Sequence, residues 1–104
     1  MSKPINTNVP AQEIIKFRDD RKWTKYHTPA NLAKSISIEA AELLELFQWS
    51  DEADLERIKE ELADILIYSI TLAEGLGLDI NSIILEKIKK NGIKYDIKRK
   101  NDLK

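Results

Sequence analysis

The stretch from Leu62 to Ala73 limits most strongly what this chain can fold into. As a helix it would be apolar on nearly every side, with Asp64 as its only charged residue. Elsewhere in the chain the apolar residues also recur at helical spacing and do not alternate as they do in strands. Only three glycines and three prolines interrupt the 104 residues. We therefore predict an all-α fold.

Caps and helix-breaking residues divide the chain into four predicted helices. Thr28 followed by Pro29 is a typical N-cap with proline at the first helical position. The helices are expected over about residues 10–21, 29–49, 51–74 and 80–91. Ser50 or Asp51 should cap the third helix, and Gly75 and Gly77 should end it. The fourth helix should start at Asp79 or Asn81 and end at Asn91-Gly92. Because a short link joins the two long helices, they should lie antiparallel in a small four-helix bundle.

We expect a single domain over residues 1–104, with a helical core at about 10–95 and a basic tail at 96–104. Four helices in such a short chain cannot cover the apolar stretch 62–73 on every side. We therefore expect a second subunit to complete the bundle, so that the protein is a homo-oligomer, either a dimer or a tetramer.

The charged residues are distributed unevenly, although the formal net charge is only −1. Residues 39–64 contain ten acids and two bases, whereas residues 86–104 contain eight bases and three acids. The first segment should attract cations and the second anions. The near-neutral total argues against a dedicated nucleic-acid-binding protein.

The chain has no cysteine and a single histidine, which excludes disulfides, thiolate metal sites and cysteine nucleophiles. No apolar run reaches the roughly 18 residues of a membrane span, and residues 1–4 lack the apolar run of a signal peptide. We expect a cytoplasmic protein without a membrane partner, whose chemistry depends on oxygen ligands.

Two carboxylates fall where an acid is unfavourable. Glu39 lies within the apolar stripe of its predicted helix, and Asp64 lies inside the apolar stretch 62–73. An ionised carboxylate held there without a partner costs several kcal/mol, so it must be neutralised, paired or bound to a cation. The only base one or two turns before Asp64 is Arg57.

Each of these carboxylates has an acidic neighbour three residues away on the same helix face, Glu42 for Glu39 and Glu61 for Asp64. Like charges at this spacing repel unless a cation lies between them. An antiparallel hairpin can bring the two pairs together. Four carboxylates without nitrogen or sulfur ligands suit Mg²⁺, with Mn²⁺ as a substitute.

With these surroundings the chain resembles the MazG-like nucleotide pyrophosphohydrolases of the all-α NTP pyrophosphatase superfamily, in particular their dCTP pyrophosphatase-like branch. The resemblance covers residues 14–95. It rests on the segment Trp23 to Leu32, on Glu39-Ala-Ala-Glu42 with its continuation to Trp49, on Glu61-Leu-Ala-Asp64 with its continuation to Tyr68, and on Lys87-x-x-x-Asn91-x-x-Lys94-Tyr95. Asp96 stands where the family's closing motif usually has proline.

The resemblance implies hydrolysis of a nucleoside triphosphate, in particular a deoxynucleotide, to the monophosphate and pyrophosphate, as in nucleotide-pool house-cleaning. The four paired carboxylates would be the catalytic and metal-binding residues. One glutamate would act as general base, and we favour Glu39 because its apolar surroundings should raise its proton affinity when no metal is bound. The expected substrate-binding residues are Trp23, His27, Trp49, Tyr68, Lys87, Asn91, Lys94 and Tyr95.

Other interpretations of these residues stay open. Tyr68 could pack in the core, His27 could pack against Leu32, and the lysines of the fourth helix could form a solvated face. A non-enzymatic helical adaptor is the alternative function for the whole chain. A nucleic-acid binder using the tail 87–104 is a second alternative. Neither alternative explains paired acids inside apolar stripes, so both are less favoured than the hydrolase.

Overall fold

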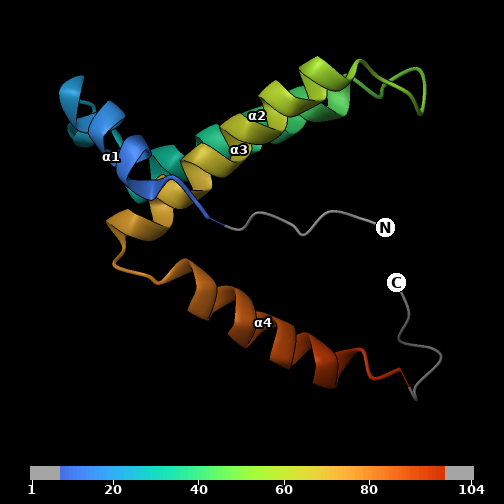
Figure 1. Ribbon diagram of the computed structural model, residues 1–104. Helices are drawn as coiled ribbons and strands as arrows, with labels where there is room; N and C mark the ends of the chain where they lie inside the picture. The colour runs from blue at the N-terminus through green and yellow to red at the C-terminus, as the bar shows by residue number, and fades with distance from the viewer. Residues whose placement is uncertain (1–7, 98–104) are drawn as a thin grey trace. The chain divides into compact units, whose positions relative to one another are not determined.

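The computed structural model describes residues 8–97. Within these residues all regular secondary structure is helical, and there is no strand. The elements are α1 (Ala11–Asp20), the 3-10 turn η1 (Thr24–Tyr26), α2 (Pro29–Glu45), α3 (Leu55–Gly75) and α4 (Ile80–Lys94), as labelled in Figure 1. The predicted all-α class is confirmed for these residues. Of the predicted basic tail, residues 98–104 lie outside the described part.

The chain divides into two compact units, one ending at Leu72 and the other beginning at Ala73. The first unit contains α1, η1, α2 and most of α3. The second contains the last residues of α3 and all of α4. The expectation of one domain over residues 1–104 stays a prediction.

The start of α2 is the one that the sequence predicts. The Thr28 hydroxyl accepts a hydrogen bond from the backbone N–H of Asn31 at 3.1 Å, and Pro29 occupies the first helical turn. The side chain of Asn31 donates to the carbonyl of Tyr26 at 3.0 Å, which fastens η1 to the beginning of α2.

The end of α2 differs from the prediction, because the helix stops at Glu45 and does not continue to Trp49. The backbone N–H groups of Leu46, Phe47 and Gln48 donate to carbonyls three residues back, a tight turn in place of α-helix. Trp49 therefore belongs to the connection between α2 and α3.

The predicted cap of α3 was also wrong. Ser50 accepts from the N–H of Glu52 in a short local turn, whereas Asp54 caps the helix by accepting from the N–H of Arg57 at 3.3 Å. Asp54 can do so because α3 begins at Leu55, several residues later than either predicted cap.

In the second unit, α3 ends in the predicted glycine turn. Gly77 has a φ of 69°, its N–H donates to Glu74, and the N–H of Leu78 donates to Ala73, the two hydrogen bonds of a Schellman motif. Asp79 then caps α4, accepting from the N–H of Ser82 at 2.9 Å.

The predicted end of α4 at Asn91-Gly92 was wrong, since the helix continues to Lys94. Gly92 does not have the positive φ that would stop a helix. A glycine inside a helix costs only about 1 kcal/mol relative to alanine, so the helix can continue through Gly92.

The two long helices α2 and α3 run side by side as an antiparallel hairpin, as the sequence predicts (Figure 1). Among the described residues of the first unit, only Leu32, which is 2% exposed, and Thr71 are buried. Most other apolar side chains are half-buried or exposed. The hairpin is therefore thinly covered, and its inner faces carry acidic as well as apolar side chains.

Candidate active site

Carboxylates from both long helices converge between α2 and α3. Glu39 projects from α2, and Glu61 and Asp64 project from α3, and one carboxylate oxygen from each lies within 4.8 Å of the other two. The spacing of three residues places Glu61 and Asp64 on one face of α3. We call Glu39, Glu61 and Asp64, together with the adjoining Glu42, the carboxylate cluster.

The cluster is electrostatically unfavourable without a cation. Burial raises the pKa of Glu39 to about 7, with further contributions from hydrogen bonding to Glu42 and Glu61 and from the charges of Glu42 and Asp64. Hydrogen bonding to Glu42, followed by burial, raises the pKa of Glu61 as well. The raised proton affinity expected for Glu39 from the sequence is thus confirmed.

These groups fit a divalent cation. Within the described residues, one carboxylate oxygen of Glu61 is buried without a hydrogen-bond partner. A buried, unpartnered anionic oxygen is unfavourable, and a hard cation would satisfy it. The donors are all carboxylate oxygens, the ligand type that Mg²⁺ and Mn²⁺ accept.

A cavity of about 400 Å³ adjoins the cluster and shares Asp64 with it. We call it the aromatic cavity. It brings together three of the predicted substrate-binding residues, Trp23, His27 and Tyr68, and its remaining lining comes from Glu13, Ile14, Phe17, Arg18, Ile67 and Thr71.

The aromatic side chains form a continuous series along this cavity. The ring centroids of Phe17 and Trp23 are 5.6 Å apart, those of Trp23 and His27 6.1 Å, and those of His27 and Tyr68 6.4 Å. The guanidinium of Arg21 stacks on Phe17 at 3.4 Å from the ring centroid. The ring planes of these three pairs are inclined to one another by 70°, 59° and 77°, and such contacts hold the rings in place along an apolar wall.

His27 contributes a polar atom to this wall. Its Nδ1 is buried and, within the described residues, has no hydrogen-bond partner. Burial, and secondarily the positive charge of Arg18, lowers the pKa of the imidazole. A neutral histidine at this position can exchange a hydrogen bond with a polar group that enters the cavity.

The contribution of α1 to the cavity was not predicted. Glu13, Ile14, Phe17 and Arg18 all line it, although no site residue was expected before Trp23. Phe17 and Ile14 share one face of α1, and that apolar face was the only available signal.

The structure does not bring Trp49 to the aromatic cavity. Its side chain is 90% exposed in the connection between α2 and α3. Its expected role in substrate binding stays a prediction.

The four predicted residues near the C-terminus lie in the second unit. Lys87, Asn91 and Lys94 share one face of α4, and the Nζ of Lys94 lies 5.2 Å from the centroid of the Tyr95 ring. The expected contacts of these four residues with phosphate also stay predictions.

None of the helices in the described part of the chain is both long and apolar enough to cross a bilayer.

An antiparallel helical hairpin with a carboxylate cluster beside an aromatic cavity defines an all-α protein able to hold a metal ion. Residues 34–104 match the MazG-like family, and the chain belongs to that family.

Named relatives agree with this assignment. The chain is 34% identical over 92 residues to dCTP pyrophosphatase 1 of Rattus norvegicus and 34% identical over 90 residues to dCTP pyrophosphatase 1 of Homo sapiens. The matches cover 79% and 77% of this chain but only 54% and 53% of those proteins, so the chain spans about half the length of these relatives.

A solved structure matches over more of its length. The crystal structure of a pyrophosphatase from Archaeoglobus fulgidus DSM 4304 is 40% identical, with a TM-score of 0.74. The match covers 90% of this chain and 99% of that one.

Proposed function

We propose that the protein is a nucleotide pyrophosphohydrolase that cleaves a nucleoside triphosphate, in particular a deoxynucleotide, to the monophosphate and pyrophosphate. The observation that carries this proposal is the position of Asp64, which belongs to the carboxylate cluster and also lines the aromatic cavity. A nucleoside held in that cavity would therefore have its phosphates at the cluster. The family and the names of the relatives support the same reaction.

The carboxylate cluster would hold the metal ion, and Mg²⁺ is the ion we propose. When bound, such a cation lowers the repulsion that an incoming nucleophile meets at the phosphate and stabilises charge on the leaving group. Glu39, Glu42, Glu61 and Asp64 are the proposed ligands, two from each helix.

The proposed role of Glu39 is that of general base. In the metal-free protein the pKa of Glu39 is raised to about 7, so the surroundings of this carboxylate favour its protonated form more than those of an ordinary glutamate do. The water oxygen bonds to the α-phosphorus, its proton passes to Glu39, and the bond from the α-phosphorus to the bridging oxygen breaks. Pyrophosphate leaves with that electron pair.

Trp23 and Tyr68 would hold the base by stacking, and the Nδ1 of His27 would exchange a hydrogen bond with its polar edge. Stacking on aromatic side chains is worth about 1–3 kcal/mol per base. The aromatic cavity thus binds and orients the nucleoside, and the carboxylate cluster acts on its phosphates.

The decisive experiment incubates the protein with a panel of NTPs and dNTPs and Mg²⁺, and measures pyrophosphate and orthophosphate separately. The proposal requires pyrophosphate and the monophosphate in equal amounts. Release of orthophosphate alone would mean that a different phosphoanhydride bond is cleaved. An adaptor without enzymatic activity would release neither.

We also propose, as the sequence predicts, that a second copy of the chain packs on α3. Leu55, Leu62 and Leu66 are 66%, 45% and 51% exposed, and their spacings of seven and four residues form a seam of the kind that pairs helices. A seam of this kind can pair with itself about a twofold axis. Leu62→Glu should convert the oligomer measured by light scattering to a monomer, and an unchanged mass would exclude this seam.

The cytoplasmic location expected from the sequence stays a prediction.

A further inference from the structure

A second hollow lies at the other end of the helical hairpin, between the end of α2 and the start of α3. It has a volume of about 430 Å³ and is lined by Glu45, Leu46, Gln48, Ala53, Asp54 and Arg57. We call it the Arg57 hollow. Its lining is mainly polar and charged, in contrast to the wall of the aromatic cavity.

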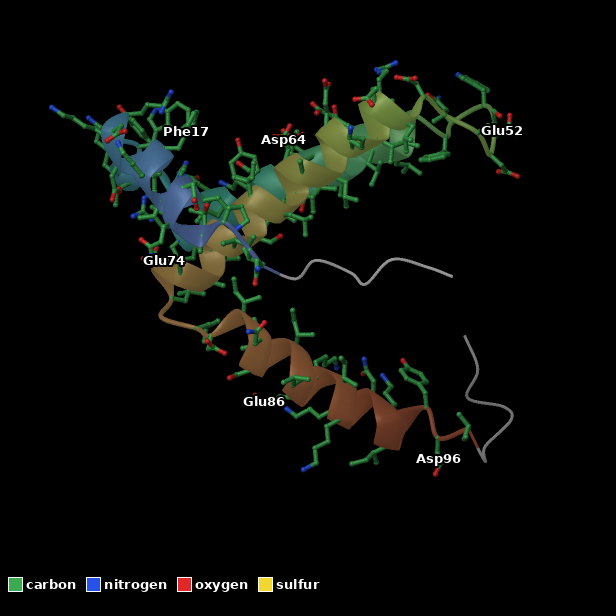
Figure 2. The ribbon with its side chains drawn as sticks, viewed as in Figure 1. Phe17, Glu52, Asp64, Glu74, Glu86 and Asp96 are labelled. Carbon is green, nitrogen blue, oxygen red and sulfur yellow. The ribbon has the colours of Figure 1, made fainter. Side chains whose placement is uncertain are left out.

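The Arg57 hollow and the aromatic cavity flank the carboxylate cluster. Along α3, Arg57 precedes Glu61 by four residues and Glu61 precedes Asp64 by three, spacings that keep all three on one face of the helix. Ile67, Tyr68 and Thr71 then follow in the aromatic cavity. In Figure 2, Asp64 accordingly lies between Phe17 of α1 and Glu52 of the α2–α3 connection.

The order on α2 is the same in reverse, as an antiparallel hairpin requires. Glu42 of the cluster precedes Glu45 of the hollow by three residues, again on one helix face. Both helices therefore place the Arg57 hollow next to the carboxylate cluster, and α3 places the aromatic cavity on the other side of the cluster.

Arg57 is the base that lies two helical turns before Asp64, and it has no role in the proposed reaction as described above. Within residues 8–97 no ion pair engages its guanidinium, although its backbone N–H donates to Asp54. A guanidinium presents a planar fork of donors that matches phosphate oxygens. An arginine at the edge of a carboxylate cluster without an ion-pair partner is suited to an anion that the cluster itself would repel.

We propose that the Arg57 hollow is the subsite for the β- and γ-phosphates, and that Arg57 binds the pyrophosphate leaving group. The inference rests on the proposed function. With the nucleoside in the aromatic cavity and the α-phosphate at the carboxylate cluster, the remaining two phosphates extend away from the cavity. On α3 this direction leads one helical turn, about 6 Å, from Glu61 to Arg57.

The acids of the hollow are compatible with this ligand. Glu45 and Asp54 would repel bare pyrophosphate, but pyrophosphate binds Mg²⁺, and Mg²⁺ keeps several water ligands. Phosphate oxygens then face Arg57, and the water ligands donate to the two carboxylates. The hollow therefore favours magnesium pyrophosphate over the free anion.

The test compares Arg57→Gln with the matched control Lys59→Gln on the same helix. Lys59 is exposed and pairs with Glu56, away from the hollow lining. Magnesium pyrophosphate should inhibit wild-type turnover, and Arg57→Gln should raise its inhibition constant at least about tenfold, the usual worth of a charge-assisted hydrogen bond. Inhibition by the nucleoside monophosphate should change less than about twofold, and Lys59→Gln should change neither.

Two results would overturn the inference. One is an Arg57→Gln variant, folded by circular dichroism, that pyrophosphate still inhibits like the wild type. The other is equal weakening of pyrophosphate and monophosphate inhibition, which would mean that Arg57 acts only through the net charge of the cluster.

Failure of the proposed function is a separate outcome. If the wild type releases no pyrophosphate from any nucleotide, the proposed function fails, and titration calorimetry with magnesium pyrophosphate still tests the subsite. Binding by the wild type that Arg57→Gln weakens tenfold supports the subsite. Absence of binding, or equal binding by both proteins, overturns it.

Discussion

Glu39 of α2 and Asp64 of α3 come from different helices, yet they place carboxylate oxygens within 4.8 Å of each other. This contact exists only because the two helices are antiparallel and each turns its acidic pair inward. It gathers negative charge that the fold itself does not neutralise.

Divalent cations should stabilise the protein. A ligand that binds only the folded state at 100 times its dissociation constant contributes about 2.7 kcal/mol, which should raise the Tm of a domain this size by roughly 10 °C. Calorimetry with Mg²⁺ or Mn²⁺ against EDTA measures this shift. Glu61→Gln should reduce it and Glu60→Gln, one residue away, should not. A Tm that does not respond to metal would instead favour the adaptor.

Without metal, stability should fall as the pH rises from about 4.5 to about 7. The pKa of Glu39 is raised from 4.5 to about 7 in the folded state, so folded Glu39 keeps a proton that the unfolded chain has released in this interval. This contribution to stability is complete below pH 4.5 and is lost as the pH passes through 7. The raised pKa of Glu61 acts in the same direction.

Urea unfolding in EDTA at several pH values measures this dependence. Glu39→Gln should flatten the profile, because the amide does not titrate. A wild-type profile that rises between pH 4.5 and 7 would contradict the burial of this carboxyl group. Saturating Mg²⁺ should weaken the dependence, since the cation favours the ionised form.

Glu42→Gln and Asp64→Asn should each lower kcat by about 100-fold or more, because the proposed site loses a charged ligand for the metal at the reacting phosphate. Helical content measured by circular dichroism should not change. Glu60→Gln serves as the exposed control. Wild-type turnover in either cluster variant would mean that the metal site lies elsewhere.

Trp23→Ala should weaken nucleotide binding through the base alone. Loss of stacking should raise KM for a dNTP by roughly tenfold. The affinity for inorganic tripolyphosphate, which has no base, should stay the same, whether it is measured by binding or by hydrolysis. Tyr26→Ala is the matched control, since Tyr26 is an exposed neighbouring aromatic residue that does not line the aromatic cavity. Equal losses for both ligands would indicate a folding defect.

Thr28→Ala should destabilise the fold by about 1 kcal/mol, because the N–H of Asn31 loses its acceptor. The Tm should fall by roughly 4–8 °C in a thermal melt. Thr28→Ser keeps the hydroxyl and should retain most of the stability. If Thr28→Ala melts at the same temperature as the wild type, the cap contributes nothing to stability.

Much of the fold follows from local rules that act within a few residues. Helical spacing of apolar residues, the Thr28 cap and the turn at Gly77 depend only on neighbouring side chains and backbone, so the helices and the antiparallel hairpin could be predicted. The errors occurred where local signals compete. Ser50 and Asp54 are both good caps, and Gly92 is compatible with either the end or the interior of a helix.

By itself the sequence determined which acids share a helix face, and therefore that the chain carries two pairs of carboxylates in need of a cation. Only the tertiary structure decided what lies beside them. The packing of α1 on the hairpin forms the aromatic cavity, and the early end of α2 leaves Trp49 outside it. Contacts between residues far apart in the chain depend on how whole helices pack, which no local pattern encodes.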